Sequence, residues 1–379
     1  MARRSGLVWH ETMMWHHVGA FAGLFPAGFP VQPGQHFETP EGKRRIKNLL
    51  DAIDFTDHLI QVAARDATDD ELARVHDRDY IASMVRADQE PTGSAGFEAP
   101  FTRGSVAIAR RAAGGAIAAA EAVLSGTVDN AYALLRPSGH HAERAEGKGI
   151  CIFNNAAVAA AHVLATSDVS RIAFVDVDVH HGNGAEEIFW RDPRVLTISL
   201  HQDRWFPPAS GMVERNGEGA GEHFNINVPL PAGCGFGAYR TAFEQVVMPA
   251  LGLYRPQMIF APFGFDGGAQ DPMGRMILSS NSFRYMADQL VGAADRYASG
   301  RLVLTHEGGY NESTVPFMAL AVFEAISGLS SGVEDPYAVI MDNMHGHDLL
   351  PHQEAVVALS RNLLTGLKAA TARLDRTAA

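Results

Sequence analysis

The sequence predicts an α/β protein with a central, mostly parallel sheet that carries helices on both faces. Apolar segments of strand length alternate with longer helical patterns, and this alternation is typical of parallel sheets. The apolar segments show little polar alternation, as expected for strands covered on both faces. The expected strands are Ala131–Leu135, Ile172–Val179, Val195–Leu200, Met258–Phe263 and Leu302–Thr305. The expected helices are Val106–Leu124, Ala156–Ala165, Tyr239–Leu253, Phe283–Ala298 and Glu354–Leu374.

The composition is that of an ordinary globular protein, since 46% of the 379 residues are hydrophobic and 20% are charged. No segment has the composition of a linker, so we expect residues 1–379 to form a single domain. A net charge of −12 argues against a nucleic acid as partner. No apolar run reaches the roughly 18 residues that a membrane span needs. The N-terminus lacks a hydrophobic signal core and the chain has only Cys151 and Cys234, so we expect a cytoplasmic protein.

Polar residues follow the end of every expected strand. In an open parallel sheet, ligands bind outside the carboxyl ends of the strands, so residues at these ends are expected to meet in one crevice. This convergence is stronger evidence for a functional site than any single motif. The segments concerned are Arg136–His141, Asp176–His181, Ser199–His201, Phe263–Asp266 and His306–Tyr310.

The segment that follows the second strand is the most informative in the chain. Because side chains alternate along a strand, Asp176, Asp178 and His180 are expected on one side and the intervening valines on the other. Polar groups at this spacing are costly to bury unless a cation pairs with them. Asp178 and His180, with Asp266 from the fourth strand end, supply three ligands and leave a position for water, as in catalytic zinc sites. Zinc would lower the pKa of that water toward about 7 and polarise a bound carbonyl.

Three further residues have side chains suited to proton transfer and to oxyanion stabilisation. His140 and His141 follow the first strand, and imidazole exchanges protons near neutral pH, so the pair is expected to supply base and acid. Tyr310 follows two glycines, which allow its hydroxyl to reach a developing oxyanion and donate a hydrogen bond. Together with the metal ligands, these residues predict a zinc hydrolase.

Seven motifs occur in order along the chain: R-P-S-G-H-H-A (Arg136–Ala142), C-I-F-N-N (Cys151–Asn155), D-V-D-V-H-H-G-N-G (Asp176–Gly184), T-I-S-L-H (Thr197–His201), G-F-D (Gly264–Asp266), D-P (Asp271-Pro272) and E-G-G-Y (Glu307–Tyr310). This ordered set resembles the histone deacetylase, acetylpolyamine amidohydrolase and acetoin-utilisation superfamily, from about the N-terminal loop to beyond Tyr310. Asn183, where many members have Asp, and the segment F-P-P-x-S-G (Phe206–Gly211) resemble the class II-like bacterial histone-deacetylase-like amidohydrolases.

The resemblance implies the arginase/deacetylase fold, with long active-site loops at the carboxyl ends of the strands. It implies a zinc ion held by the three ligands named above. It also implies that Asp176 holds His140, and that His141, paired with Asn183, is the main general base and acid. Tyr310 would be the residue that polarises the substrate carbonyl.

The resemblance further implies a structural potassium ion beside the zinc ligands. A second monovalent site would use the backbone near Phe189 and Val195. We also expect a homodimer or homotetramer, with a small-molecule amide substrate as the binding partner. The residues of the first potassium site are Asp176, Asp178, His180, Ser199 and Leu200.

Departures from the family pattern bear on the substrate. The acyl channel of the family is usually walled by two phenylalanines; Phe206 matches one, but Ile150 stands where the other is expected, which weakens the grip on a lysyl-type chain. Gly308 is expected to line the same channel. The acid that many relatives carry at the rim has no clear counterpart in residues 93–98, where Glu98 is the candidate. We therefore expect a small or non-histone amide as substrate.

Other functions could use the same residues. The substrate could be acetyl-lysine in a protein, an acetylated polyamine, a xenobiotic carboxamide or a short-chain ester. An arginase-like dimanganese ureohydrolase would need another aspartate at the position of Gly268, so a second metal is not expected. A catalytically inactive acyl-binding protein would be expected to have lost Tyr310 or a histidine, and both are present.

Overall fold

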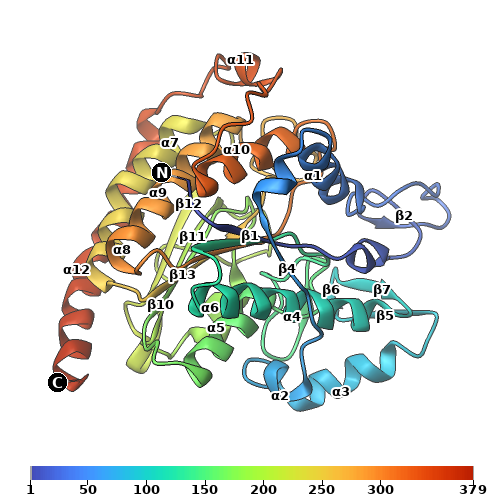
Figure 1. Cartoon of the computed structure of the whole chain (residues 1–379), viewed down its shortest axis with the longest axis horizontal. Coiled ribbons are helices and arrows are strands. Elements are labelled where there is room, and N and C mark those ends of the chain that lie inside the picture. Colours follow the sequence, from blue (N-terminus) through green and yellow to red (C-terminus); the bar gives the residue numbers. More distant parts are fainter. Residues whose placement is uncertain (1, 379) are drawn as a thin grey trace.

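The computed structural model describes residues 2–378 and contains an eight-stranded sheet in which every neighbouring pair is parallel. The strand order is β12-β11-β10-β13-β14-β8-β1-β4, and helices lie on both sides of this sheet (Figure 1). The predicted fold class is confirmed. The strands are β1 (Ser5–Val8), β4 (Ile60–Val62), β8 (Asn130–Ala133), β10 (Ile172–Asp176), β11 (Val195–Gln202), β12 (Asn225–Leu230), β13 (Met258–Phe263) and β14 (Leu302–His306).

Each face of the sheet has its own hydrophobic core. Phe174 and Phe260 stack on the first face with ring centroids 5.6 Å apart, whereas Val175 and Ala261 point into the core of the second. This alternation between adjacent residues buries both faces of each central strand. The helices on the first face are α4 (Ser105–Leu124), α5 (Asn155–Thr166) and α6 (Asn183–Phe189). Those on the second are α1 (Glu41–Ala52), α7 (Phe236–Ala242), α8 (Met248–Tyr254), α9 (Ser280–Tyr297), α10 (Val315–Ser327) and α12 (Pro351–Ala378).

Three further α-helices and three two-stranded ladders lie outside the main sheet and its covering helices. No helix within residues 2–378 is long and apolar enough to cross a membrane. The remaining α-helices are α2 (Asp69–Leu72), α3 (Arg78–Ala87) and α11 (Ala338–Met341). Three two-stranded ladders pair β2 (Phe21–Ala22) with β3 (Phe25–Pro26), β5 (Thr92–Ser94) with β7 (Pro100–Thr102), and β6 (Gly96–Phe97) with β9 (Gly147–Lys148).

The five predicted strands form the centre of the sheet, in the order β11-β10-β13-β14-β8. The three strands that sequence reasoning missed lie at the edges: β12 on one side, and β1 with β4 on the other. Strands β1 and β4 contain only four and three residues, which is too short for a periodic signal. In β12 asparagines alternate with apolar residues, and the buried side chains of Asn225 and Asn227 donate to the Glu186 carboxylate.

The five predicted helices are all present, but one is not uniform. Residues Tyr239–Leu253 were predicted as a continuous helix, whereas the chain forms α7, a π-helical turn at Phe243–Val247 and then α8. Pro249 lies in the first turn of α8. A proline lacks the N–H that an α-helix needs and its ring crowds the carbonyl four residues earlier, so the wider turn accommodates it.

Strand β10 is shorter than predicted, because its ladder ends at Asp176 rather than at Val179. Its pairing with β13 stops even earlier, at Phe174. Val175, Val177 and Val179 nevertheless all belong to the core of the second face, so the alternation continues after the ladder ends. The intervening polar residues are thereby free to face the crevice between the separating strands.

A buried ion pair ties the N-terminal segment to the end of β8. The Arg136 Nε and Nη2 atoms donate to the two carboxylate oxygens of Glu38, each at 2.7 Å, and both side chains are 1% exposed. Arg136 Nη1 also donates to the carbonyls of Met14 and His16. Burial alone would raise the pKa of Glu38, but the Arg136 charge outweighs it and lowers that pKa to about 2. The pair therefore holds residues 14–38 against the sheet.

Replacing Glu38 by alanine is expected to lower the free energy of unfolding by about 3–5 kcal/mol, because the Arg136 charge would stay buried without a partner. The exposed pair Arg78–Asp70, with side chains 71% and 82% exposed, supplies the control. Asp70→Ala should cost only about 0–1 kcal/mol. Urea denaturation of both variants measures the difference, and equal losses would contradict the structural role of the buried pair.

Candidate active site

Three ligand-type side chains meet at the carboxyl ends of β10 and β13. Asp178 and His180 follow β10, and Asp266 follows β13. The His180 Nδ1 atom lies 3.0 Å from Asp178 Oδ1 and 3.0 Å from Asp266 Oδ2. Both carboxylates are fully buried, and the three donor groups are close enough to bind a single ion. Two carboxylates and one imidazole form a donor set that suits catalytic zinc.

The surroundings of these ligands also fit a cation. Among residues 2–378, the buried Asp266 Oδ2 is one of the few side-chain atoms without a well-formed hydrogen bond, and its polar neighbour is His180 Nδ1 at 3.0 Å. The backbone approaches the carboxylates at two glycines: a Cβ atom at Gly264 would lie 2.0 Å from Asp178 Oδ2, and one at Gly308 would lie 2.0 Å from Asp266 Oδ2. A buried carboxylate oxygen without a well-formed hydrogen bond is costly, and a divalent cation held by the three ligands would remove that cost.

His140 and His141 lie in the loop after β8, beside the metal ligands, with ring centroids 3.9 Å apart. The His140 Nδ1 atom is 3.0 Å from Asp176 Oδ2, which is the pairing that the family resemblance implied. Burial lowers the pKa of His140, but the carboxylates of Asp178 and Asp176 outweigh it and raise that pKa to about 10. The acids around His140 therefore favour its protonated form.

His141 has the opposite electrostatic state. Burial, reinforced by the charges of His140 and His180, holds its pKa well below the usual value. Its Nδ1 atom is 2.7 Å from Asn183 Oδ1, and the Asn183 amide nitrogen donates to the His141 carbonyl and to Glu143. Because the amide nitrogen is used as a donor, Oδ1 is the acceptor and His141 Nδ1 carries the proton. His141 Nε2 is thus the ring atom that can accept one.

Tyr310 is positioned by a residue whose role sequence reasoning missed. The Asp271 carboxylate accepts hydrogen bonds from the backbone N–H groups of Tyr310 (2.7 Å) and Asn311 (3.2 Å) with one oxygen, and from Met273 (2.8 Å) with the other. This ties the loop after β13 to the loop after β14. Burial, followed by the nearby Asp266 carboxylate, raises the pKa of Tyr310 well above its usual value, so its hydroxyl stays protonated.

Glu307 is a second residue to which the sequence assigned no role. One oxygen of its buried carboxylate accepts hydrogen bonds from the backbone N–H groups of Gly139 (2.7 Å) and His140 (3.1 Å), and the other accepts from the Thr305 hydroxyl. The Ser138 hydroxyl donates to the Glu307 carbonyl. Glu307 therefore fixes the backbone that presents both histidines. Only the position of E-G-G-Y after a strand could have indicated this.

A cavity of about 940 Å³ opens onto His141, His180 and Tyr310. Ile150 and Phe206 line it, as the sequence predicted. The Phe206 ring packs edge-on against His141, with centroids 4.8 Å apart. The remaining wall is mostly apolar and comes in large part from the N-terminal segment.

Two expectations about the channel need correction. The absence of a second aromatic wall was inferred from Ile150, but Phe97 supplies an aromatic ring that stacks on Phe206 with centroids 6.0 Å apart and planes at 8°. The exposed Glu98 lines the mouth of the cavity, so the rim does carry an acid. The sequence named Glu98 as the candidate acid but could not indicate the Phe97 contact, because residue 97 reaches the site through the β6–β9 ladder.

The sequence of this chain is similar to those of histone deacetylases. The model of the histone deacetylase domain matches residues 36–326. The chain belongs to the histone deacetylase family. It is 47% identical over 339 residues to the histone deacetylase-like amidohydrolase of Pseudomonas aeruginosa, covering 89% of each chain.

Two further matches have lower sequence identity but also cover most of both chains. The chain is 32% identical to a probable deacetylase of Archaeoglobus fulgidus, with 88% of this chain and 89% of that one covered. The crystal structure of the HDA15 HD domain superimposes with a TM-score of 0.84 at 29% identity, covering 97% of this chain and 98% of that one. These matches confirm the arginase/deacetylase fold and place the chain among hydrolases of the deacetylase and amidohydrolase type.

The remaining predicted residues of this family member lie around the metal ligands. Asp176 and Ser199 are neighbours in the β10–β11 register, and the Leu200 side chain is buried in the core of the second face. Gly308 was expected in the channel wall, but it is not among the described residues that line the cavity. Its backbone N–H instead donates to Asp178 Oδ2 (2.8 Å). Gly308 therefore contacts the candidate metal ligands through its backbone.

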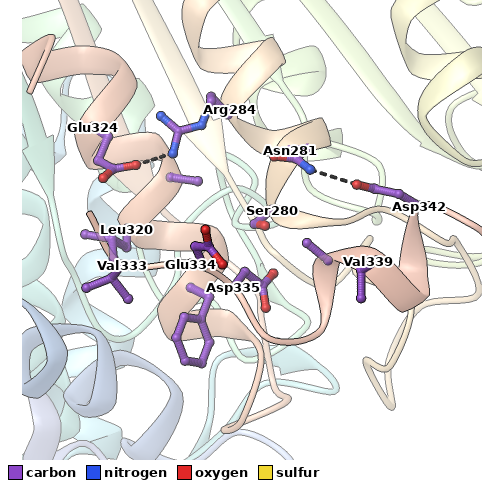
Figure 2. Close-up of a pocket in the computed structure, with 13 residues that line it drawn as sticks. Ser280, Asn281, Arg284, Leu320, Glu324, Val333, Glu334, Asp335, Val339 and Asp342 are labelled. Atoms are coloured by element: carbon purple, nitrogen blue, oxygen red, sulfur yellow. Dashed lines mark hydrogen bonds and ion pairs between the residues drawn. The ribbon is translucent and has the colours of Figure 1, made fainter. Parts of the chain in front are cut away.

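A second hollow, of about 460 Å³, lies between α9, α10 and residues 333–342 (Figure 2). Asn281 donates to Asp342 (2.7 Å) and Arg284 pairs with Glu324 at its edges. None of the predicted site residues lines this hollow. The residues with catalytic chemistry are thus gathered at the first cavity.

Gly308→Ala is expected to weaken zinc binding roughly 10–100-fold, the range found when groups that support a metal ligand are changed. The added Cβ would stand 2.0 Å from Asp266 Oδ2 and 2.8 Å from Asp178 Oδ2, so both ligands must move. Gly292→Ala is the control, because nothing lies within 4 Å of a Cβ at that position. Competition with a chelating dye measures the affinity, and a wild-type value for Gly308→Ala would contradict this account.

Proposed function

We propose that this protein is a zinc-dependent amidohydrolase that cleaves the carboxamide bond of a non-histone substrate. The observation that supports this most is the convergence of Asp178, His180 and Asp266 beside the free Nε2 atom of His141 at the inner end of one cavity. Zinc bound to the three ligands would lower the pKa of a water molecule and polarise the amide carbonyl.

The side chains divide the remaining chemistry among them. Neutral His141 would accept a proton at Nε2 from the attacking water, since its Nδ1 proton is committed to Asn183. The protonated Tyr310 hydroxyl would donate a hydrogen bond to the substrate oxygen as negative charge develops on it. His141, once protonated, would return its proton to the leaving amine. His140, held by Asp176, would lie against His141 beside these steps.

The family relationship supports a deacetylase-type reaction but leaves the substrate open. The two features that favoured a small or non-histone amide over acetyl-lysine were the missing second phenylalanine and the lack of a clear rim acid; residues 97–98 supply both an aromatic ring and an acid. A non-histone amide is still favoured, because the wall of the cavity is largely apolar whereas histone tails are rich in lysine. An acetylated polyamine or an acetyl-lysine protein is the alternative. We also propose a structural potassium ion near Asp176 and Ser199.

One zinc ion per chain is the first expected result, since the three ligands form a single site. Chelation should abolish amide hydrolysis, and Zn²⁺ or Co²⁺ should restore it. Asp266→Asn should lose the ion, whereas Asp70→Asn, at an exposed position, should retain it. Elemental analysis of the purified proteins measures the number of metal ions per chain. Two bridged transition metals per chain would instead favour a ureohydrolase.

Replacing His141 or Tyr310 is expected to lower kcat without removing the zinc ion. His141→Ala should reduce kcat roughly 10²–10⁴-fold by removing proton transfer. Tyr310→Phe should reduce it roughly 10²–10³-fold by removing one donor to the oxyanion. Tyr297→Phe, on α9, is the control and should keep wild-type turnover. Because neither residue is a ligand, both variants should still contain zinc; full turnover by Tyr310→Phe would show that its assigned role is wrong.

A further inference from the structure

We propose that Glu143 is a positioning residue for the general base His141, and that it acts by fixing the orientation of the Asn183 amide. This inference deepens the proposed amidohydrolase function and rests on it. The Asn183 Oδ1 atom contacts the His141 ring, whereas its Nδ2 atom lies 2.8 Å from Glu143 Oε1. The acid therefore stands directly behind the amide that holds the general base.

The orientation of the Asn183 amide decides which ring nitrogen of His141 carries the proton. With Oδ1 toward the ring, Nδ1 donates and Nε2 is free to accept a proton from water. The reversed amide would present its NH2 group to the ring, so Nδ1 would become the acceptor and the proton would move to Nε2. His141 could then not act as a base. Because the oxygen and the nitrogen of an amide are nearly equal in size, only their hydrogen-bond partners can select the orientation.

Two acceptors select the productive orientation, and Glu143 supplies the charged one. The Asn183 Nδ2 atom donates to the His141 carbonyl (3.0 Å) and to Glu143 Oε1 (2.8 Å). Reversal would bring the Asn183 oxygen against both of these acceptors. Hydrogen bonds to charged groups are stronger than those between neutral groups, so we expect the carboxylate to contribute most of the selection.

The Glu143 carboxylate is itself held at its other oxygen. Lys148 Nζ pairs with Glu143 Oε2 and lies 3.2 Å from Glu146 Oε2. Burial lowers the pKa of Lys148, but the hydrogen bond and the charge of Glu143 outweigh it and raise that pKa. Since Lys148 donates to Oε2, Oε1 is the oxygen left for Asn183. One line of hydrogen bonds thus runs from Lys148 to His141.

The backbone around Glu143 is held by contacts that do not involve its carboxylate. The Arg144 N–H donates to the side chain of Glu187 on α6 (2.9 Å). The Gly184 N–H, also on α6, donates to the His140 carbonyl (3.0 Å). Loss of the carboxylate should therefore leave the loop and α6 in place and release only the amide.

The test begins with Glu143→Gln, using 4-nitroacetanilide and N-acetylputrescine as amide probes. The oxygen of the new side chain would pair with Lys148, so its NH2 group would face Asn183 and favour the reversed amide. We expect kcat to fall roughly 10- to 100-fold. KM and zinc content should stay unchanged, because Glu143 is neither a candidate ligand nor among the described residues that line the cavity.

A second background separates orientation of the amide from a general structural role. Asn183→Asp introduces the residue that many family members carry, and its two carboxylate oxygens are equivalent. There is then no amide to orient, so adding Glu143→Gln in the Asn183→Asp background should cause no loss of kcat. A structural role of Glu143 would instead cost the same factor in both backgrounds.

Two further variants serve as control and as a milder test. Glu146→Gln removes the other carboxylate beside Lys148 and should keep wild-type kcat. Lys148→Gln removes the partner of Glu143 Oε2 but leaves the carboxylate, so it should lower kcat less than Glu143→Gln does. This smaller loss should also disappear in the Asn183→Asp background, which tests the inference even if Glu143→Gln does not fold. Thermal melting should be alike for all the folded variants.

The outcomes distinguish failure of this inference from failure of the proposed function. Wild-type kcat in Glu143→Gln, an equal loss in both backgrounds, or a loss through KM alone would each show that the inference is wrong. Hydrolysis of neither probe by wild-type enzyme, or hydrolysis that survives chelation, would count against the amidohydrolase proposal itself and against the inference with it. A loss of kcat confined to the background with Asn183 supports both.

Discussion

The burial of two carboxylates on either side of one imidazole is the constraint on which the site depends. Asp178 and Asp266 are fully buried, and each has an oxygen 3.0 Å from His180 Nδ1. Burial, with the neighbouring charge of Asp178, raises the pKa of Asp266 to about 7. Such an arrangement is unfavourable for a protein by itself and favourable around a divalent cation. The separation of β10 and β13, and the glycines at positions 264 and 308, make room for it.

Backbone hydrogen bonds then orient the acids and the catalytic loops. The N–H groups of Val179 and Gly308 donate to Asp266 and Asp178, so each ligand is held from a strand other than its own. Glu307 holds the loop with both histidines by accepting two backbone N–H groups. Loops are usually the mobile part of a fold, but here buried carboxylates anchor them. The positions of the catalytic groups therefore depend on contacts between strand ends that are far apart in sequence.

The sequence by itself determined the fold class and the central strands, and it indicated most residues of the candidate site. These predictions rest on local signals: unbroken apolar segments for buried strands, and polar residues placed where those strands end. Asp178, His180 and Asp266 could be assigned together because the carboxyl ends of parallel strands must share one edge of a sheet. The edge strands were missed because they lack these local signals. Strands β1 and β4 are too short, and in β12 asparagines serve Glu186 in place of apolar residues.

The tertiary structure alone decided the channel and the residues that support the catalytic groups. Ile150 indicated a missing aromatic wall, whereas Phe97, about fifty residues earlier in the chain, provides it through the β6–β9 ladder. Asp271 and Glu307 belong to the D-P and E-G-G-Y motifs, but only their backbone partners show what they hold. Periodicity and spacing report which way a side chain faces within one element. They do not report which distant loop will meet it, because that depends on how separate elements pack.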